Sequence, residues 1–117
     1  MNLLVGRFYF KQTKNGNLLG EFSNNLTKLI FTECANIKSE FTKKHSFIGD
    51  YETVWFEKGA ESFTLKIEFK FKNKEILKLT WTNPQNNQII FHGEGFIVDK
   101  ILIGNYQATN KNENSIV

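Results

Sequence analysis

The sequence predicts an all-β protein, an antiparallel up-and-down meander that closes into a barrel of about eight strands. Three observations support this prediction. One long segment alternates strictly between apolar and polar residues, short turn sequences separate the apolar runs, and a glycine repeatedly stands two positions before an aromatic residue or a second glycine. Residues two positions apart share a face of a strand, so a ring can cover the backbone that glycine leaves bare where a small barrel coils sharply. The repeats are Gly6-Arg7-Phe8, Gly20-Glu21-Phe22, Gly49-Asp50-Tyr51, Gly93-Glu94-Gly95-Phe96 and Gly104-Asn105-Tyr106.

The first two strands are expected at residues 3–10 and 18–23. The loop between them contains Asn15-Gly16, and this pair favours a tight reversal because both residues adopt positive φ at low cost. Residues 26–44 allow two interpretations. Five apolar residues recur there at helical spacing, whereas the β-branched residues and the surrounding strands favour a hairpin with residues 37–43 as its second strand. We expect the hairpin.

The clearest strand is residues 62–72, in which five apolar residues alternate with polar ones. A turn at residues 73–75 leads to a strand that contains Leu77, Leu79 and Trp81. Three more strands complete the expected barrel: residues 46–57 before this pair, and residues 88–98 and 101–107 after a turn at residues 83–87, with Asp99-Lys100 as a two-residue hairpin turn.

The length of 117 residues indicates one domain, for which we expect a barrel over residues 1–108 and a polar tail over residues 109–117. Apolar runs are short, so no membrane interaction is expected. No signal peptide is visible, which favours a cytoplasmic location, although a secreted chain that has lost its leader would look the same. Cys34 is the only cysteine, and we expect a half-buried, unreactive thiol there.

The net charge of +3 comes from fourteen Lys and one Arg. Proteins that bind nucleic acid favour Arg, and the lysines of residues 62–72 face away from the Phe side chains of that strand. Charges and rings therefore cannot act on one surface, and nucleic-acid binding is not expected.

The meander of Gly-x-aromatic strands resembles the calycin group, which contains the lipocalin, fatty-acid-binding and avidin-type barrels. Leu19-Gly20-Glu21-Phe22, Ile48-Gly49-Asp50-Tyr51 and Ile103-Gly104-Asn105-Tyr106 are similar to the Leu-x-Gly-x-Tyr pattern of avidin-like strands. Avidin-type biotin sites use several Trp, whereas this chain has only Trp55 and Trp81. The resemblance therefore implies the architecture and not biotin binding.

Four inward-facing aromatic residues are candidates for a ligand site. They combine apolar bodies with hydrogen-bonding tips, which suits a mostly apolar pocket with few polar anchors. We expect a non-catalytic barrel that binds a small apolar or aromatic ligand through Tyr51, Trp55, Trp81 and Tyr106, with Glu57 or His92 near the mouth. The alternative is a barrel that side chains fill and that acts as an oligomerising or protein-interaction module, since eight strands leave just enough room for side chains.

No motif for catalysis, a metal or a cofactor is present. His92-Gly93-Glu94 has the His-x-Glu of zinc deaminases, but no Pro-Cys-x-x-Cys follows. A weaker hypothesis is an enzyme that uses Asp50, His92 or Glu94 in the lumen. His45 and His92 alone are too few ligands to predict a metal site.

The last two strands carry consecutive apolar residues, so both of their faces are hydrophobic. The residues are Ile89, Ile90, Phe96, Ile97, Ile101, Leu102 and Ile103. A barrel covers only the inner face of its strands. An outer patch that includes Leu102 or its neighbours therefore predicts a homo-oligomer, most simply a two-fold dimer.

Overall fold

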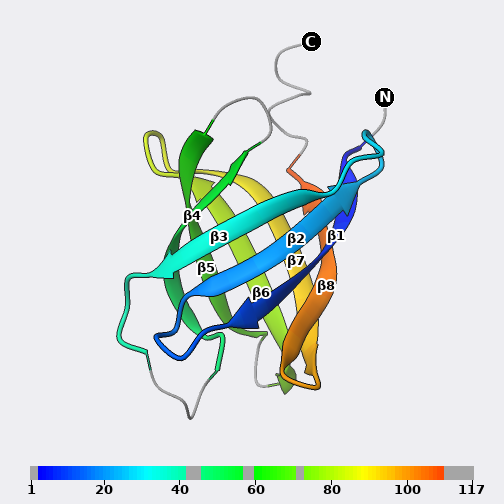
Figure 1. The fold of residues 1–117 in the computed structure, drawn as a ribbon. Helices are drawn as coiled ribbons and strands as arrows, with labels where there is room; N and C mark the ends of the chain where they lie inside the picture. Colours follow the sequence, from blue (N-terminus) through cyan, green and yellow to red (C-terminus); the bar gives the residue numbers. More distant parts are fainter. Residues whose placement is uncertain (1–2, 42–45, 57–59, 71–72, 110–117) are drawn as a thin grey trace.

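Eight antiparallel strands close into a barrel in the order of the sequence, as predicted (Figure 1). The computed structural model describes residues 3–41, 46–56, 60–70 and 73–109. The strands are β1 (Val5–Gln12), β2 (Leu18–Asn24), β3 (Phe31–Ile37), β4 (Gly49–Phe56), β5 (Ala60–Lys70), β6 (Asn73–Asn83), β7 (Gln88–Val98) and β8 (Ile101–Ala108). Pairing of β1 with β8, from Val5 opposite Gln107 to Lys11 opposite Ile101, closes the barrel. The expected polar tail lies outside the described residues beyond Thr109.

The predicted turn at Asp99-Lys100 has the expected backbone, whereas in Asn15-Gly16 only the glycine has positive φ. Asp99 and Lys100 have φ values of 53° and 68° between the paired residues Val98 and Ile101. Positive φ at both central residues is the geometry that matches the twist of a two-residue hairpin. Gly16 has φ of 92° in the loop between β1 and β2.

The described part of this segment, residues 26–41, forms neither the expected hairpin nor a helix. In this segment the structure describes one strand, β3, preceded by a loop in which side chains bind the backbone: the Leu26 N–H donates to Asn24 Oδ1 at 2.9 Å and the Leu29 N–H donates to Thr27 Oγ1 at 3.1 Å. Such local bonds compete with regular secondary structure. Leu26, Leu29 and Ile30 are at least 57% exposed, so the helically spaced residues do not bury a common face.

Two other predicted boundaries were also wrong. Residues 73–75 belong to β6 and not to a turn, because Asn73 already pairs with Lys70. Of the described residues 37–41, which were expected to be a strand, only Ile37 belongs to one, β3. The rest of that expected strand, residues 42–43, lies outside the described residues.

Glycine is needed where neighbouring strands approach too closely for a side chain. A Cβ at Gly20 would lie 2.0 Å from the Tyr9 carbonyl oxygen, and a Cβ at Gly104 would lie 2.1 Å from that of Glu94. Both glycines face the interior, on the same strand face as the aromatic residues two positions later in the sequence. The Gly-x-aromatic pattern therefore marks the tightly coiled part of the barrel wall.

The two ends of the barrel differ. We call upper the end at which β1 begins and β8 ends, and lower the end that carries residues 13–17 and 99–100 (Figure 1). The lower interior is packed with residues that are at most 2% exposed: Phe10, Leu18, Tyr51, Leu65, Ile67, Leu77, Leu79 and Leu102. Phe47, 2% exposed, belongs to this core. Its N–H donates to Gln12 Oε1 at 2.6 Å and its carbonyl accepts from the Tyr51 hydroxyl at 2.8 Å, so this loop residue is fixed at the lower end.

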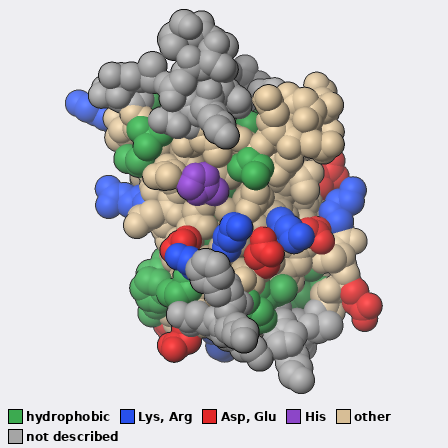
Figure 2. All heavy atoms as spheres, turned by 180° about the vertical axis from the view of Figure 1, so that it is seen from behind, with side chains coloured by type: hydrophobic (Ala, Val, Ile, Leu, Met, Phe, Trp, Pro, Cys, Tyr) green, Lys and Arg blue, Asp and Glu red, His purple; other side chains and the backbone are tan. Residues whose placement is uncertain are grey.

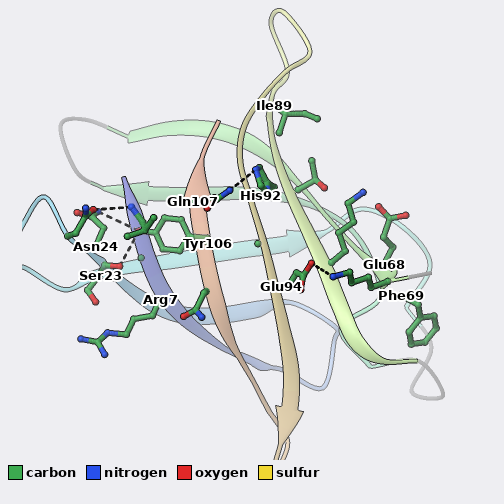
Figure 3. Close-up of a pocket in the computed structure, with 18 residues that line it drawn as sticks. Arg7, Ser23, Asn24, Glu68, Phe69, Ile89, His92, Glu94, Tyr106 and Gln107 are labelled. Atoms are coloured by element: carbon green, nitrogen blue, oxygen red, sulfur yellow. Dashed lines mark hydrogen bonds and ion pairs between the residues drawn. The ribbon is translucent and has the colours of Figure 1, made fainter. Parts of the chain in front are cut away.

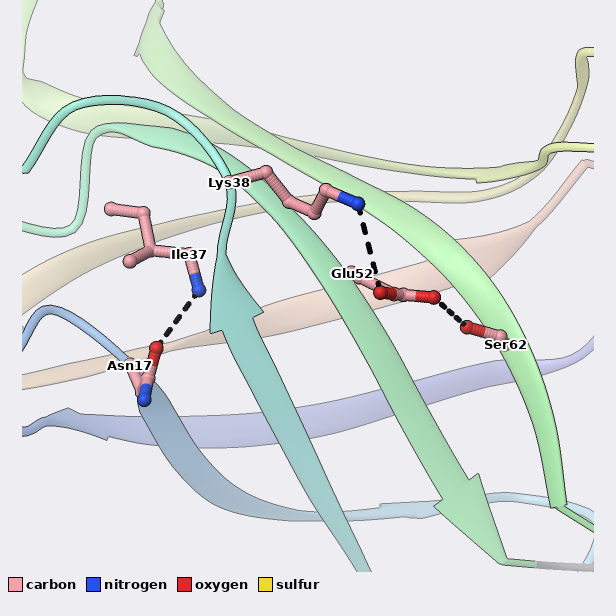
Figure 4. Close-up of polar contacts among 5 residues, drawn as sticks. All are labelled: Asn17, Ile37, Lys38, Glu52 and Ser62. Carbon is pink, nitrogen blue, oxygen red and sulfur yellow. Dashed lines mark hydrogen bonds and ion pairs between the residues drawn. The ribbon is translucent and has the colours of Figure 1, made fainter.

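Polar contacts join neighbouring strands on the outer face (Figure 4). Asn17 Oδ1 accepts from the Ile37 N–H at 2.9 Å and so joins the loop after β1 to the end of β3. Glu52 on β4 lies 3.7 Å from Lys38 Nζ and accepts from the Ser62 hydroxyl of β5 at 2.8 Å. No helix of the described residues is long and apolar enough to span a membrane.

Candidate functional site

Aromatic rings gather in the upper half of the barrel interior. The upper aromatic cluster consists of Phe8, Phe22, Phe31, Trp55, Phe63, Trp81, Phe91 and Tyr106. Its neighbouring rings lie 4.6–6.5 Å apart between centroids. Most pairs are tilted or edge to face, whereas Trp55 and Phe63 stack at 4.6 Å with an interplanar angle of 14°. This continuous set of rings takes one residue from each of the eight strands.

The rings of the cluster differ in their exposure. Phe8, Trp81 and Tyr106 are buried, at 3–7% exposed. Phe22, Phe31, Trp55, Phe63 and Phe91 are only half-buried. The cluster is therefore accessible to solvent through its outer members, in contrast to the packed lower interior.

Among the described residues, one buried carboxyl group, that of Glu33, lies beneath these half-buried rings. Glu33 is on β3, two residues after Phe31, and pairs across the sheet with Gly20 of β2 and Trp55 of β4. It is 4% exposed, and it is the only charged residue among the buried residues that the structure describes.

Two neutral donors hold the Glu33 carboxylate. The Thr53 hydroxyl donates to Oε2 at 2.5 Å and the Trp81 indole N–H donates to the same oxygen at 2.9 Å. No described residue donates to Oε1. One oxygen of a buried carboxylate thus has no partner among the described residues, an arrangement that usually costs free energy.

Burial raises the pKa of the Glu33 carboxyl from 4.5 to about 7, although the hydrogen bonds from Thr53 and Trp81 act in the opposite direction. The group therefore changes its charge near neutral pH. It can accept a hydrogen bond from a ligand when ionised and donate one when protonated.

Three of the four aromatic residues that the sequence suggested as ligand-binding lie in this cluster: Trp55, Trp81 and Tyr106. Tyr51 faces the interior too, but at the lower end, where its hydroxyl accepts from Gln12 Nε2 at 3.0 Å and donates to Phe47. Burial raises the Tyr51 pKa to about 12. Glu57 lies outside the described residues.

His92 lies on the outer face and does not approach the interior. It is exposed on β7 next to the inward-facing Gly93, and the same alternation places Glu94 and Asp50 outside. The hypothesis of acid–base residues in the lumen is therefore wrong for these three. The physical reason is strand periodicity, because each of them adjoins a residue that faces inward.

His92 instead lines a surface groove of about 1250 Å³ (Figure 3). The groove runs from β5 through β8 to β1 and β2, with Tyr106 and Asn24 at one end and Phe69 and Glu68 at the other. His92 Nε2 lies 3.4 Å from Gln107 Nε2, and Glu94 forms an ion pair with Lys70 at 2.5 Å. His92 and Glu94, two positions apart on β7, thus interact with different partners.

Charges of both signs alternate along this groove. Lys78 pairs across the sheet with Glu68 and with Glu94, and Figure 2 shows acidic and basic side chains intermingled below the histidine. A ligand of one charge finds no uniform potential on such a surface. Within the described residues no group of three potential ligands could hold a metal ion.

The outer faces of β7 and β8 carry an apolar strip, which we call the β7–β8 face: Phe96, Val98, Ile101 and Ile103. Phe96 and Val98 are 48% and 46% exposed. A pocket of about 480 Å³ lies beside the strip and is lined by Tyr9, Ile30, Phe96 and Ile103, among others. Leu102 was wrongly included in the predicted outer patch, because it faces the interior and is fully buried. Cys34 is exposed rather than half-buried.

Sequence reasoning missed Glu33 and Thr53. Glu33 lies in the segment whose strand could not be assigned, so its inward position was hidden. Once β3 is known, the alternation of Phe31, Glu33 and Ala35 places the carboxylate inside. The role of Thr53 depends on Glu33 of the neighbouring strand β3, so it could not be found before β3 was known.

Comparisons with protein-family models, with curated proteins and with solved structures found no match for this chain.

Proposed function

We propose that this protein is a non-catalytic barrel that binds a small, largely apolar or aromatic ligand at the upper aromatic cluster. The closed eight-stranded meander and the strand motifs support a place in the calycin group, whose barrels hold small molecules. The binding residues in this proposal are Trp55, Trp81, Tyr106 and Phe91, with Glu33 as the polar anchor.

The observation that carries the proposal is the buried Glu33. A barrel that needed only a stable interior would place an aliphatic residue there, because burying a carboxyl group costs free energy that its two hydrogen bonds offset only in part. Such violations of the packing rules are found at functional sites more often than elsewhere. One polar group under an aromatic layer matches the composition of small-molecule sites, which are mostly apolar with few fixed polar groups.

The partly exposed rings provide the route of entry. Trp55 and Phe63 are half-buried and stack face to face. A planar ligand can replace one of these rings in the stack at little cost, because it restores the same contact. The packed lower end and the loop residue Phe47 make entry from that side unfavourable.

The effect of Trp55→Ala on ligand affinity tests this proposal. Hits from an aromatic fragment library, identified by ligand-observed NMR, should bind Trp55→Ala about tenfold or more weakly, because the variant loses a stacking partner. Trp55 is half-buried, so the variant should still unfold cooperatively.

Tyr51→Phe is the matched control, since it alters an inward-facing aromatic residue at the opposite end of the barrel. Its affinity for the hits should equal that of the unchanged protein. Equal affinities in all three proteins, or the absence of any hit, would refute binding at the upper aromatic cluster.

A second candidate function, self-association through the β7–β8 face, is favoured by the apolar side chains of that strip. Phe96 and Val98 are about half exposed, next to half-buried Ile101 and Ile103. Apolar patches of this kind are typical of interaction sites. A two-fold dimer would cover the strip with its own copy.

Phe96→Lys should abolish this dimer. Placing a charge in the middle of the strip should raise the dissociation constant by about a hundredfold or more, as for a central aromatic residue of an interface. Sedimentation velocity measures the result. Leu26→Lys alters an equally exposed residue outside the strip and should leave the dimer intact, and a monomeric unchanged protein would exclude the interface.

A further inference from the structure

Among the described residues, the negative charge of Glu33 in the barrel interior has no positive partner. Among the described residues Glu33 is the only buried charged side chain, and the described Lys, Arg and His residues are exposed or lie on the outer face. The hydrogen-bond donors to Glu33, Thr53 and Trp81, are both neutral. Nothing described in the interior neutralises the carboxylate when it is ionised.

The geometry of these donors leaves room for a third one. Thr53 and Trp81 both donate to Oε2, so both lone pairs of Oε1 remain available. Donation from Thr53 and Trp81 also favours the ionised form, because a carboxylate accepts hydrogen bonds better than a carboxylic acid. The site thus presents a preformed acceptor whose natural partner is a charged N–H donor.

The surrounding rings favour the same kind of ligand. The faces of Trp, Tyr and Phe rings attract cations through their quadrupoles, and Trp does so most strongly. Trp55 pairs directly with Glu33 across the sheet, Trp81 donates to it, and Phe31 precedes it by two residues on the same face. A cation bound at Oε1 would be close to several aromatic rings.

We infer that the ligand of the upper aromatic cluster is an organic ammonium ion, an amine with an apolar or aromatic body, whose N–H donates to Glu33 Oε1. This inference rests on the proposed binding function and specifies its ligand class. Carboxylate ligands are disfavoured, since they would meet an unpaired negative charge and no described interior cation.

Three probes of similar shape and different charge test this inference: 2-phenylethylamine, 2-phenylethanol and 3-phenylpropionate. Isothermal titration calorimetry at about pH 8, where Glu33 is ionised, gives their affinities. The amine should bind about tenfold or more tightly than the alcohol, from a charge-assisted hydrogen bond and cation–π contacts. The carboxylate should bind most weakly. This series needs no variant of the protein.

The variant Glu33→Gln then tests whether Glu33 causes the preference for the charged amine. The variant should lose about tenfold or more in affinity for the amine and keep its affinity for the alcohol. The unchanged protein should also bind the amine more weakly at about pH 6 than at pH 8, because Glu33 becomes protonated, whereas Glu33→Gln should show no such change. The described groups that face Glu33 from β2, β4 and β6 are Gly20, Phe22, Thr53, Trp55 and Trp81, and none of these titrates in this range.

The outcomes separate the inference from the function on which it rests. Preference for the amine that disappears in Glu33→Gln supports the inference. Binding of the alcohol or the carboxylate as tightly as the amine, with loss of affinity in Trp55→Ala, overturns the inference and leaves the binding function in place. If none of the three probes binds, both the ammonium inference and the proposed binding function are overturned for ligands of this size.

Discussion

Replacing Trp81 with alanine is expected to lower the free energy of unfolding by about 3–5 kcal/mol. Trp81 is 3% exposed, and its ring contacts those of Phe8, Phe91 and Tyr106. Its removal leaves a cavity in the middle of the upper aromatic cluster. It also removes one of the two donors to Glu33, which leaves the buried carboxylate with the Thr53 hydroxyl alone.

Trp81→Phe separates these two effects. Phenylalanine retains much of the ring contact but has no N–H, so the remaining loss reflects the missing hydrogen bond, about 1.5–3 kcal/mol when Glu33 is ionised. At low pH, where Glu33 is protonated, this part should shrink. Urea denaturation followed by circular dichroism gives the unfolding free energies of Trp81→Ala and Trp81→Phe. A loss below about 1 kcal/mol for Trp81→Ala would contradict the packed arrangement of the cluster.

Glu33→Gln is expected to make the protein about 3 kcal/mol more stable above neutral pH. The Glu33 pKa rises from 4.5 to about 7, and each pKa unit corresponds to about 1.4 kcal/mol of folding stability that is lost when Glu33 ionises. Glutamine has a similar shape and can still accept the bonds from Thr53 and Trp81. Above pH 7, however, it does not force the fold to bury a charge.

The sign of the pH dependence follows from the two states. Between pH 4.5 and about 7 the folded protein keeps the Glu33 proton while the unfolded chain loses it. The folded state therefore binds more protons in this window, and stability falls as pH rises. The unfolding free energy of the unchanged protein should decrease from about pH 5 to about pH 8. That of Glu33→Gln should not show this decrease.

Glu52→Gln is the matched control for this experiment. Glu52 is exposed on the outer face, where it contacts Lys38 and Ser62, so its replacement should leave the pH dependence unchanged. A parallel decrease for Glu33→Gln and the unchanged protein would mean that another group causes it.

The barrel could be predicted because its signals are local. Strict alternation along β5, the pair Asp99-Lys100 and the Gly-x-aromatic repeats each determine backbone geometry over a few residues. The inward direction of Trp55 and Tyr106 followed from the same two-residue period.

The polar anchor of the site could not be predicted, because it depends on closure of the sheet. Trp81 and Glu33 are 48 residues apart in sequence and meet only across the lumen. The loop before β3 is held by side chains of Asn24 and Thr27, whose bonds leave no periodic pattern. Leu102 was misplaced because its apolar neighbours Ile101 and Ile103 hide the alternation of β8.

Everything proposed for the upper aromatic cluster depends on a carboxyl group that titrates near neutral pH inside the barrel. The most direct measurement is the pH titration of the side-chain carboxyl ¹³C signals of labelled glutamate, with Glu33→Gln to assign the signal. We predict one glutamate with a midpoint near 7, which is absent in the variant. If every glutamate titrates near the ordinary value of 4.5, Glu33 is hydrated and the proposed anchor does not exist.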